Sequence, residues 1–224
     1  MARQKLLIFD CDGVLVDSEP LSIRVLMETM HDLGVPMTAA ECYHHFLGRS
    51  LSSMKTTLSD AYGRTLTDHQ LAAMRERLYT LYRAELKPIV GIARALDAID
   101  LPCCVASSSL PDRIKLSLGL TGLTHYFGAH VFSATMVANG KPAPDLFLLA
   151  SQRMSEAPEN CIVIEDSPAG IEAAHRAGMR ALAFVGGSHS GPAGLRETVA
   201  AMHPYCIFER MEDLPALIET LPMG

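Results

Sequence analysis

The sequence predicts an α/β protein, a Rossmann-like doubly wound parallel sheet with a small all-α cap domain inserted after the first strand. Short apolar runs recur along the chain, and most gaps between them carry helical patterns, as in doubly wound sheets. This alternation of strand and helix patterns stops between about residues 17 and 86, where only helix signals occur. The 224 residues, 49% of them hydrophobic, suffice for one core domain with an insert.

The first strand is expected at residues 5–10. It is a nearly continuous apolar run that ends in polar residues and Gly13, as a strand buried on both faces should. Further strands are expected at residues 101–106, 130–134, 161–165, 180–185 and 205–208. Residues 186–194, rich in Gly and Ser, are expected to form a loop after the fifth strand.

The insert opens with the signals of a helix start. Asp17 and Ser18 can cap a helix, Pro20 suits its first turn and Gly34 can end it. Apolar residues at helical spacing recur in this segment and in a later one: Ile23, Met27 and Met30, then Leu71, Met74, Leu78 and Leu81. We therefore expect a core domain of residues 1–16 and 87–224, and a cap of about four helices over residues 17–86.

Composition narrows the class of partner. The net charge is −6, and the 19 Lys and Arg residues are scattered rather than clustered, which argues against a nucleic-acid partner. The apolar stretch at residues 6–9 is too short for a signal peptide, and no run approaches the roughly 20 apolar residues of a membrane span. Six cysteines without C-x-x-C spacing fit reduced thiols. We expect a cytoplasmic protein, monomeric by default, with no membrane or nucleic-acid partner.

Two aspartates mark the end of the first strand. Asp10 and Asp12 flank Cys11, and in an extended chain residues two apart face the same side. In open α/β sheets, ligands bind in the crevice beyond the carboxyl ends of the strands, so this pair stands where chemistry is expected. Asp12 with Gly13 is also ordinary turn chemistry, and these residues alone leave both interpretations open.

Two more acids end the fourth expected strand. Glu165 and Asp166 would reach the same edge of the sheet as Asp10 and Asp12, so that four carboxyl groups converge. Such a cluster needs a cation, and oxygen ligands with water favour Mg²⁺. Asp166 could instead cap the following helix, but Ser167 with the proline after it already supplies a cap and first turn.

A serine and a lysine fit the same site. Ser107 ends the second strand near a helix start, where its hydroxyl and neighbouring backbone N–H groups could hold phosphoryl oxygens. Lys141 lies in a stretch that Pro142 keeps extended, and its ammonium could offset the charge of an anionic substrate. The plainer alternatives are a helix-capping serine and a solvent-facing lysine.

Taken in order, four motifs resemble the signatures of the haloacid dehalogenase superfamily. They are Phe9-Asp-Cys-Asp-Gly-Val-Leu-Val-Asp-Ser18, Ala106-Ser107, Gly140-Lys141-Pro142 through Asp145, and Glu165-Asp-Ser-Pro-Ala-Gly170. The resemblance spans the core domain, and the insert position is similar to that of β-phosphoglucomutase-like subfamilies with a helical cap. The sequence looks similar to bacterial phosphatases of the 6-phosphogluconate phosphatase type.

The resemblance implies a mechanism. Asp10 would attack phosphorus to form an aspartyl-phosphate, while Asp12 would protonate the leaving alkoxide and later activate water. It also implies Mg²⁺ bound by Asp10, the backbone carbonyl of Asp12 and Asp166, with Glu165 in support, and a phosphoryl group bound by Ser107 and Lys141. The second aspartate separates phosphatases of this superfamily from its dehalogenases.

Three classes of function compete: a phosphatase acting on small phosphorylated metabolites, a sugar phosphomutase, and a non-catalytic module that keeps the fold. Every residue that the chemistry needs is present, which weakens the third. Similar mutases carry a histidine and an arginine where this chain has Ser22 and Leu51, which favours hydrolysis. The substrate depends on the cap, where Arg49 is either a contact to an anionic group or a solvated surface residue.

Overall fold

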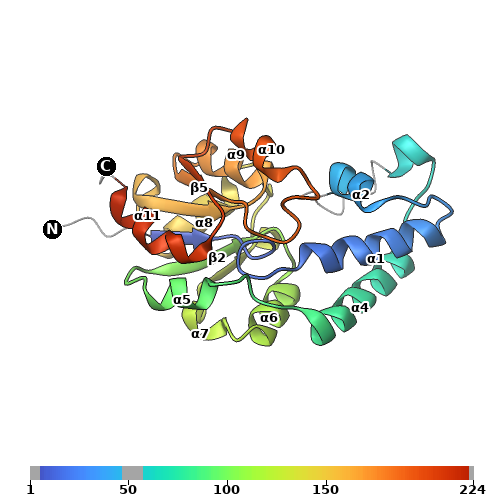
Figure 1. Cartoon of the computed structure of the whole chain (residues 1–224), viewed down its shortest axis with the longest axis horizontal. Coiled ribbons are helices and arrows are strands. Elements are labelled where there is room, and N and C mark those ends of the chain that lie inside the picture. Colours follow the sequence, from blue (N-terminus) through green and yellow to red (C-terminus); the bar gives the residue numbers. More distant parts are fainter. Residues whose placement is uncertain (1–5, 47–57, 222–224) are drawn as a thin grey trace.

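The core of the chain is one parallel sheet flanked by helices (Figure 1). The computed structural model describes residues 6–46 and 58–221. Six strands follow the order β3-β2-β1-β4-β5-β6, so the chain starts in the middle, winds to one edge and then to the other. The strands are β1 (Leu6–Phe9), β2 (Cys103–Ser107), β3 (Val131–Ser133), β4 (Cys161–Glu165), β5 (Arg180–Phe184) and β6 (Cys206–Phe208). The predicted doubly wound fold is confirmed.

Helices cover both faces of the sheet because the strands are apolar on both sides. In β1, Leu7 and Phe9 face one apolar cluster, whereas Leu6 and Ile8 face the other, and all four are at most 1% exposed. The first cluster is completed by α5 (Ile92–Asp97), α6 (Pro111–Leu120), α7 (Thr124–Phe127) and α11 (Leu214–Thr220). The second is completed by α8 (Asp145–Arg153), α9 (Pro168–Arg176) and α10 (Leu195–Ala200).

The strand boundaries agree with the sequence to within a residue or two. The apolar run at β2 ends at residue 106, and the strand continues to Ser107, the serine expected at its end, which pairs in register with Ser133 of β3. Ser107 is 1% exposed at the carboxyl end of its strand. Backbone pairing therefore holds this hydroxyl at the carboxyl end of β2.

The insert forms a helical cap beside the sheet (Figure 1). It contains α1 (Glu19–Asp32), α2 (Ala39–Phe46), a helical segment at residues 58–62 and α4 (Asp68–Glu85). Its own apolar core includes Ile23, Leu26, Met30, Cys42, Leu58 and Leu66. No helix in the described ranges is long and apolar enough to cross a membrane.

Two connecting segments join the cap to the core. The N–H of Asp17 donates to the carbonyl of Lys87 at 2.9 Å, and a bridge links Val16 to Pro88. We propose to divide the chain at this paired connection, with residues 17–86 as the cap. The helix α4 also contacts α6 of the core, so the cap touches the core through this helix as well as through its connections.

Candidate active site

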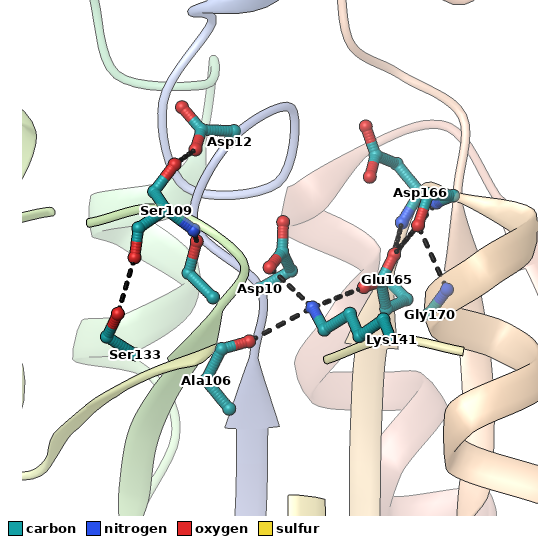
Figure 2. A network of polar contacts seen from close by, with 11 residues as sticks. Asp10, Asp12, Ala106, Ser109, Ser133, Lys141, Glu165, Asp166 and Gly170 are labelled. Carbon is teal, nitrogen blue, oxygen red and sulfur yellow. Dashed lines mark hydrogen bonds and ion pairs between the residues drawn. The ribbon is translucent and has the colours of Figure 1, made fainter. Parts of the chain in front are cut away.

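The carboxyl ends of the central strands bring the predicted residues together. Asp10 follows β1, and its N–H donates to the carbonyl of Ile164 in β4 at 3.0 Å. Ser107 and Glu165 are the last residues of β2 and β4. Lys141 reaches the same edge from the segment before α8 (Figure 2). The strands β1 and β4 lie on either side of the point where the winding reverses, which is where ligands bind in open α/β sheets.

Lys141 is a buried link between the strands. Its Nζ donates to Asp10 Oδ1 and Glu165 Oε1, each at 2.6 Å, and to the carbonyl of Ala106 at 3.1 Å. The lysine side chain is only 4% exposed, so the solvent-facing alternative is wrong. Burial alone would lower the pKa of Lys141, but the charges of Asp10 and Glu165 raise it, and the ammonium stays protonated.

Glu165 binds Lys141 through one carboxylate oxygen and the start of α9 through the other. Its Oε2 accepts hydrogen bonds from the N–H groups of Asp166 and Ser167, at 2.9 and 2.8 Å, and from the Ser167 hydroxyl at 2.9 Å. The hydroxyl of Ser167 in turn caps α9 by accepting from the N–H of Gly170 at 3.0 Å. Gly170 has no room for a side chain, since a Cβ there would lie 1.8 Å from Glu165 Oε1. Asp166 is therefore not the helix cap.

Asp10, Glu165 and Asp166 form a buried acidic cluster. One carboxylate oxygen from each lies within 4.8 Å of the others. Burial, together with the charges of the neighbouring acids, raises the pKa of Asp10 well above its usual range, although Lys141 opposes this rise. Burial also raises the pKa of Asp166. Gly13 leaves space beside the cluster: at φ +78°, a Cβ there would lie 1.9 Å from Asp166 Oδ2.

The oxygen-only donors of this cluster fit a hard cation such as Mg²⁺. Asp10 and Asp166 are the better ligands, because both oxygens of Glu165 are already engaged by protein donors. The sequence suggested that four carboxyl groups would converge, and the structure gathers three. The side chain of Asp12 is not part of the group, so Asp12 could contribute a main-chain carbonyl only.

Asp12 is held by three donors of its own. The hydroxyls of Ser18 and Ser109 donate to its two oxygens at 2.6 Å each, and Arg113 Nη2 donates to Oδ1 at 2.8 Å. Figure 2 shows the pairing with Ser109 apart from the Lys141 contacts. Burial would raise the pKa of Asp12, but the charge of Arg113 and the three hydrogen bonds outweigh it and lower the pKa. This carboxylate is ionised.

Two serines that the sequence places near helix starts do not cap those helices. Ser18 does stand at the N-cap position of α1, but its hydroxyl donates to Asp12 and does not cap the helix. Ser107 accepts from the N–H of Ser109 at 3.1 Å, and α6 begins after Leu110, so Ser107 is not a helix cap either. Polar groups that sequence propensity assigns to helix ends are here turned toward the site.

Sequence reasoning missed Arg113 and His189. Arg113 lies in the first turns of α6, directly after the serines that follow β2, and its side chain is 23% exposed. His189 belongs to the loop after β5, is 1% exposed, and places Nε2 3.0 Å from Asp166 Oδ2. The same loop contacts the cap connection, since the N–H and hydroxyl of Ser188 donate to Asp17 Oδ1 at 3.2 and 2.8 Å. Both residues lie in segments that follow sheet strands, and this position was the sequence signal that could have marked them as site candidates.

Glu19 and Ser22, in the first turn of α1, complete this side of the site. Burial and the nearby charge of Asp12 raise the pKa of Glu19 to about 7. The hydroxyl of Ser22 lies 3.3 Å from Arg113 Nη2 and 3.5 Å from the Tyr82 hydroxyl. Arg49 and Leu51 lie outside the described residues.

Together the fold and site define a doubly wound α/β protein with a buried cluster of carboxylates at the carboxyl ends of its central strands. The haloacid dehalogenase-like hydrolase pattern matches residues 4–178, and the chain belongs to this family. With phosphatases among its named relatives, it is a hydrolase of phosphoric monoesters.

Three relatives illustrate the similarity. The 6-phosphogluconate phosphatase of Escherichia coli is 31% identical over 219 residues, covering 97% of this chain and 96% of its own. A haloacid dehalogenase-like protein of unknown function from Agrobacterium tumefaciens is 32% identical, with a TM-score of 0.85 over 96% of this chain and 98% of its own. A hydrolase of the same family from Deinococcus radiodurans, solved with bound phosphate and sodium, is 28% identical, with a TM-score of 0.78 over 98% of this chain and 97% of its own.

Proposed function

We propose that this chain is a Mg²⁺-dependent phosphatase that hydrolyses small phosphorylated metabolites, either sugar phosphates or phosphorylated sugar acids, through an aspartyl-phosphate on Asp10. The observation that carries the proposal is that two aspartates close together in the sequence lie in different surroundings. Asp10 lies in the acidic cluster with Lys141 on one of its oxygens, whereas Asp12 is held apart by Ser109 and Arg113. Two carboxylates with separated environments suit a nucleophile and an acid-base group.

The two aspartates divide the reaction into two displacements at phosphorus. In the first, a carboxylate oxygen of Asp10 forms a bond to phosphorus and the ester bond breaks. Asp12, protonated by the water of a preceding turnover or from solvent, gives that proton to the leaving oxygen and becomes ionised. In the second, Asp12 takes a proton from water, which attacks phosphorus and releases phosphate and the free Asp10 carboxylate. The ionised Asp12 of this structure is the form that the second step needs.

The transferred phosphoryl group is proposed to bind beside Asp10. Lys141 would balance part of its charge, and Ser107, at the end of β2, would donate a hydrogen bond to one of its oxygens. The Deinococcus relative binds phosphate, which supports a phosphate site in this family. Lys141 is already 2.6 Å from Asp10, so it lies next to the reacting carboxylate without rearrangement.

Magnesium is proposed to bind between Asp10 and Asp166, with the carbonyl of Asp12 as a third protein ligand and Glu165 in support. When bound, the cation would neutralise negative charge on the phosphoryl oxygens and on the buried carboxylates. Gly13 keeps the space beside Asp166 open. His189, 3.0 Å from Asp166, would hold that carboxylate from the other side.

A phosphomutase is the alternative that the sequence left open. A mutase must hold a sugar phosphate that has turned over, and it must keep Asp12 from activating water meanwhile. At position 22, where similar mutases have a histidine, this chain places a serine hydroxyl within 3.3 Å of Arg113. Unlike that histidine, the hydroxyl of Ser22 carries no charge of its own, which supports hydrolysis.

The proposed setting is a cytoplasmic monomer that acts on free metabolites and has no nucleic-acid or membrane partner. A net charge of −6 supports the absence of a polyanionic partner, because no excess of cations is available to neutralise phosphates.

A phosphate-release screen tests the proposal. The purified chain is incubated with phosphorylated sugars and sugar acids, first in EDTA and then with Mg²⁺ restored. We expect stoichiometric phosphate from at least one compound, only with Mg²⁺ and without a bisphosphate activator. Full activity in EDTA would remove the metal from the proposal. Conversion of glucose 1-phosphate to its 6-phosphate isomer, much faster than phosphate release, would make the chain a mutase.

A further inference from the structure

Arg113 is a core residue that touches the cap at the acid-base side of the site. Its Nη2 donates to Asp12 Oδ1 at 2.8 Å and to the Ser22 hydroxyl in α1 at 3.3 Å. Its guanidinium carbon lies 5.4 Å from the ring centroid of Tyr82 in α4. One guanidinium thus joins α6 of the core to α1 and α4 of the cap.

The contacts of Arg113 leave much of its donor capacity unused. A guanidinium has five N–H donors, and within the described part of the chain the hydrogen bonds of Arg113 use Nη2 alone. Its Nε is buried and has no hydrogen-bond partner among the described residues. A buried donor left unpaired costs free energy, so holding Asp12 does not account for the whole arrangement. Planar guanidinium groups with free donors are suited to carboxylates, which they bind through two parallel hydrogen bonds.

The place of Arg113 relative to the reaction decides what it can contact. The phosphoryl group belongs beside Asp10 and Lys141, whereas the leaving oxygen belongs beside Asp12, which protonates it. The carbon skeleton of the substrate must therefore extend from Asp12 toward the cap. Because Arg113 is 2.8 Å from Asp12, its remaining donors lie within a few bond lengths of that skeleton.

We infer that Arg113 is a specificity-determining residue that binds a carboxylate on the leaving part of the substrate, so that the preferred substrates are small phosphorylated acids and not neutral sugar phosphates. This inference rests on the proposed function, because it takes the leaving group to lie at Asp12. A carboxylate fits better than a second phosphate. Asp12 and Glu19 already place acidic groups beside the guanidinium, so a singly charged group meets less repulsion there than a doubly charged one. The other described neighbours, Ser22 and Tyr82, are neutral hydroxyls.

The test uses pairs of compounds that differ only at one carbon. 6-Phosphogluconate is compared with glucitol 6-phosphate, and 3-phosphoglycerate with glycerol 3-phosphate; in each pair a carboxylate replaces a CH₂OH group. The quantity measured is the ratio of kcat/KM for the acid to that for the neutral partner. Any effect of Arg113 on Asp12 acts on both members of a pair and cancels in this ratio.

For the wild type we expect a ratio of at least about 10 in one pair, since a hydrogen bond to a charged group is worth about 10- to 100-fold in binding. Arg113→Met should lower that ratio by a similar factor, and Arg113→Lys should lower it less because the charge is kept. Arg153→Met, an exposed arginine on α8, is the matched control and should leave the ratio unchanged. Equal losses for acid and neutral substrate in Arg113→Met would overturn the inference.

A binding measurement separates this inference from the proposed function. Calorimetric titration of the Asp10→Asn variant, with and without Arg113→Met, gives Kd for 6-phosphogluconate, glucitol 6-phosphate and the three-carbon pair without turnover. Acid preference that depends on Arg113 would support the inference even if no phosphate were released. Phosphate release without any acid preference would overturn the inference and leave the phosphatase standing. If Arg113→Met does not fold, as judged by thermal melting, the Lys variant alone must still lower the ratio.

Discussion

Replacing Lys141 by methionine probes the structure of the site without any substrate. The change keeps most of the length of the side chain but leaves Asp10 and Glu165 without their shared cation, in surroundings where these side chains are 11% and 1% exposed. Removing one partner of a buried ion pair costs about 3–5 kcal/mol. In a chain of this size, 1 kcal/mol corresponds to about 2–4 °C in Tm. We therefore expect Lys141→Met to melt about 6–20 °C below the wild type.

The pH dependence of that loss has a definite sign. Lys141 now opposes the rise in the pKa of Asp10, so its removal raises this pKa further above the unfolded value of about 4. A carboxyl group whose folded pKa is raised loses stability as pH climbs from its unfolded pKa through its folded one. The Tm difference between variant and wild type should therefore be smaller near pH 5 than near pH 8.

The assay is differential scanning calorimetry of metal-free protein at these two pH values. Lys115→Met, an exposed lysine on α6, is the matched control and should melt within about 2 °C of the wild type. A similar small effect for Lys141→Met at pH 8, or a difference that narrows as pH rises, would refute the reasoning that the ammonium is the buried partner of both carboxylates.

Three further changes probe the surroundings of the site. In Gly13→Ala, a residue with a left-handed φ of +78° gains a Cβ that would lie 1.9 Å from Asp166 Oδ2. This change should weaken Mg²⁺ binding at least 10-fold in a calorimetric titration with the metal alone, and unchanged affinity would contradict the crowding argument. Glu19→Gln should raise Tm more at pH 8 than at pH 5, because a folded pKa of about 7 makes ionised Glu19 unfavourable only at the higher pH, and an equal rise at both would rule this out. Asp12→Asn should bind substrate but lower kcat by at least about 100-fold, the low end of acid-base catalysis, and a smaller loss would exclude the assigned role.

The fold and the carboxylates could be predicted because they follow from local pattern and sheet topology. Apolar runs identify the strands, and the rule that ligands bind beyond their carboxyl ends places Asp10 and Glu165 at one edge. Lys141 was named as a candidate from the proline that follows it, although its burial between two acids could not be seen in the sequence. Its environment depends on β1 and β4 meeting across more than 150 residues of chain.

Arg113 and His189 could not be predicted because their roles depend on tertiary approach. An arginine in the first turns of an amphipathic helix is ordinarily solvated, but Ser22 of α1 and Tyr82 of α4 help to enclose Arg113. A histidine in a loop of glycines and serines has no local pattern to follow; its burial comes from the loop folding back over Asp166. Ser18 is similar, since Asp12 withdraws its hydroxyl from the helix it was expected to cap.

Identification of the phosphorylated residue tests the central claim most directly. The Asp12→Asn variant is mixed with a substrate from the phosphate-release screen, quenched, and treated with borohydride, which reduces an acyl phosphate on aspartate to homoserine. Peptide mass spectrometry then locates the reduced residue. The proposed mechanism predicts homoserine at position 10. Reduction at Asp166, or an unmodified Asp10 in a sample that has released phosphate from its substrate, would contradict it.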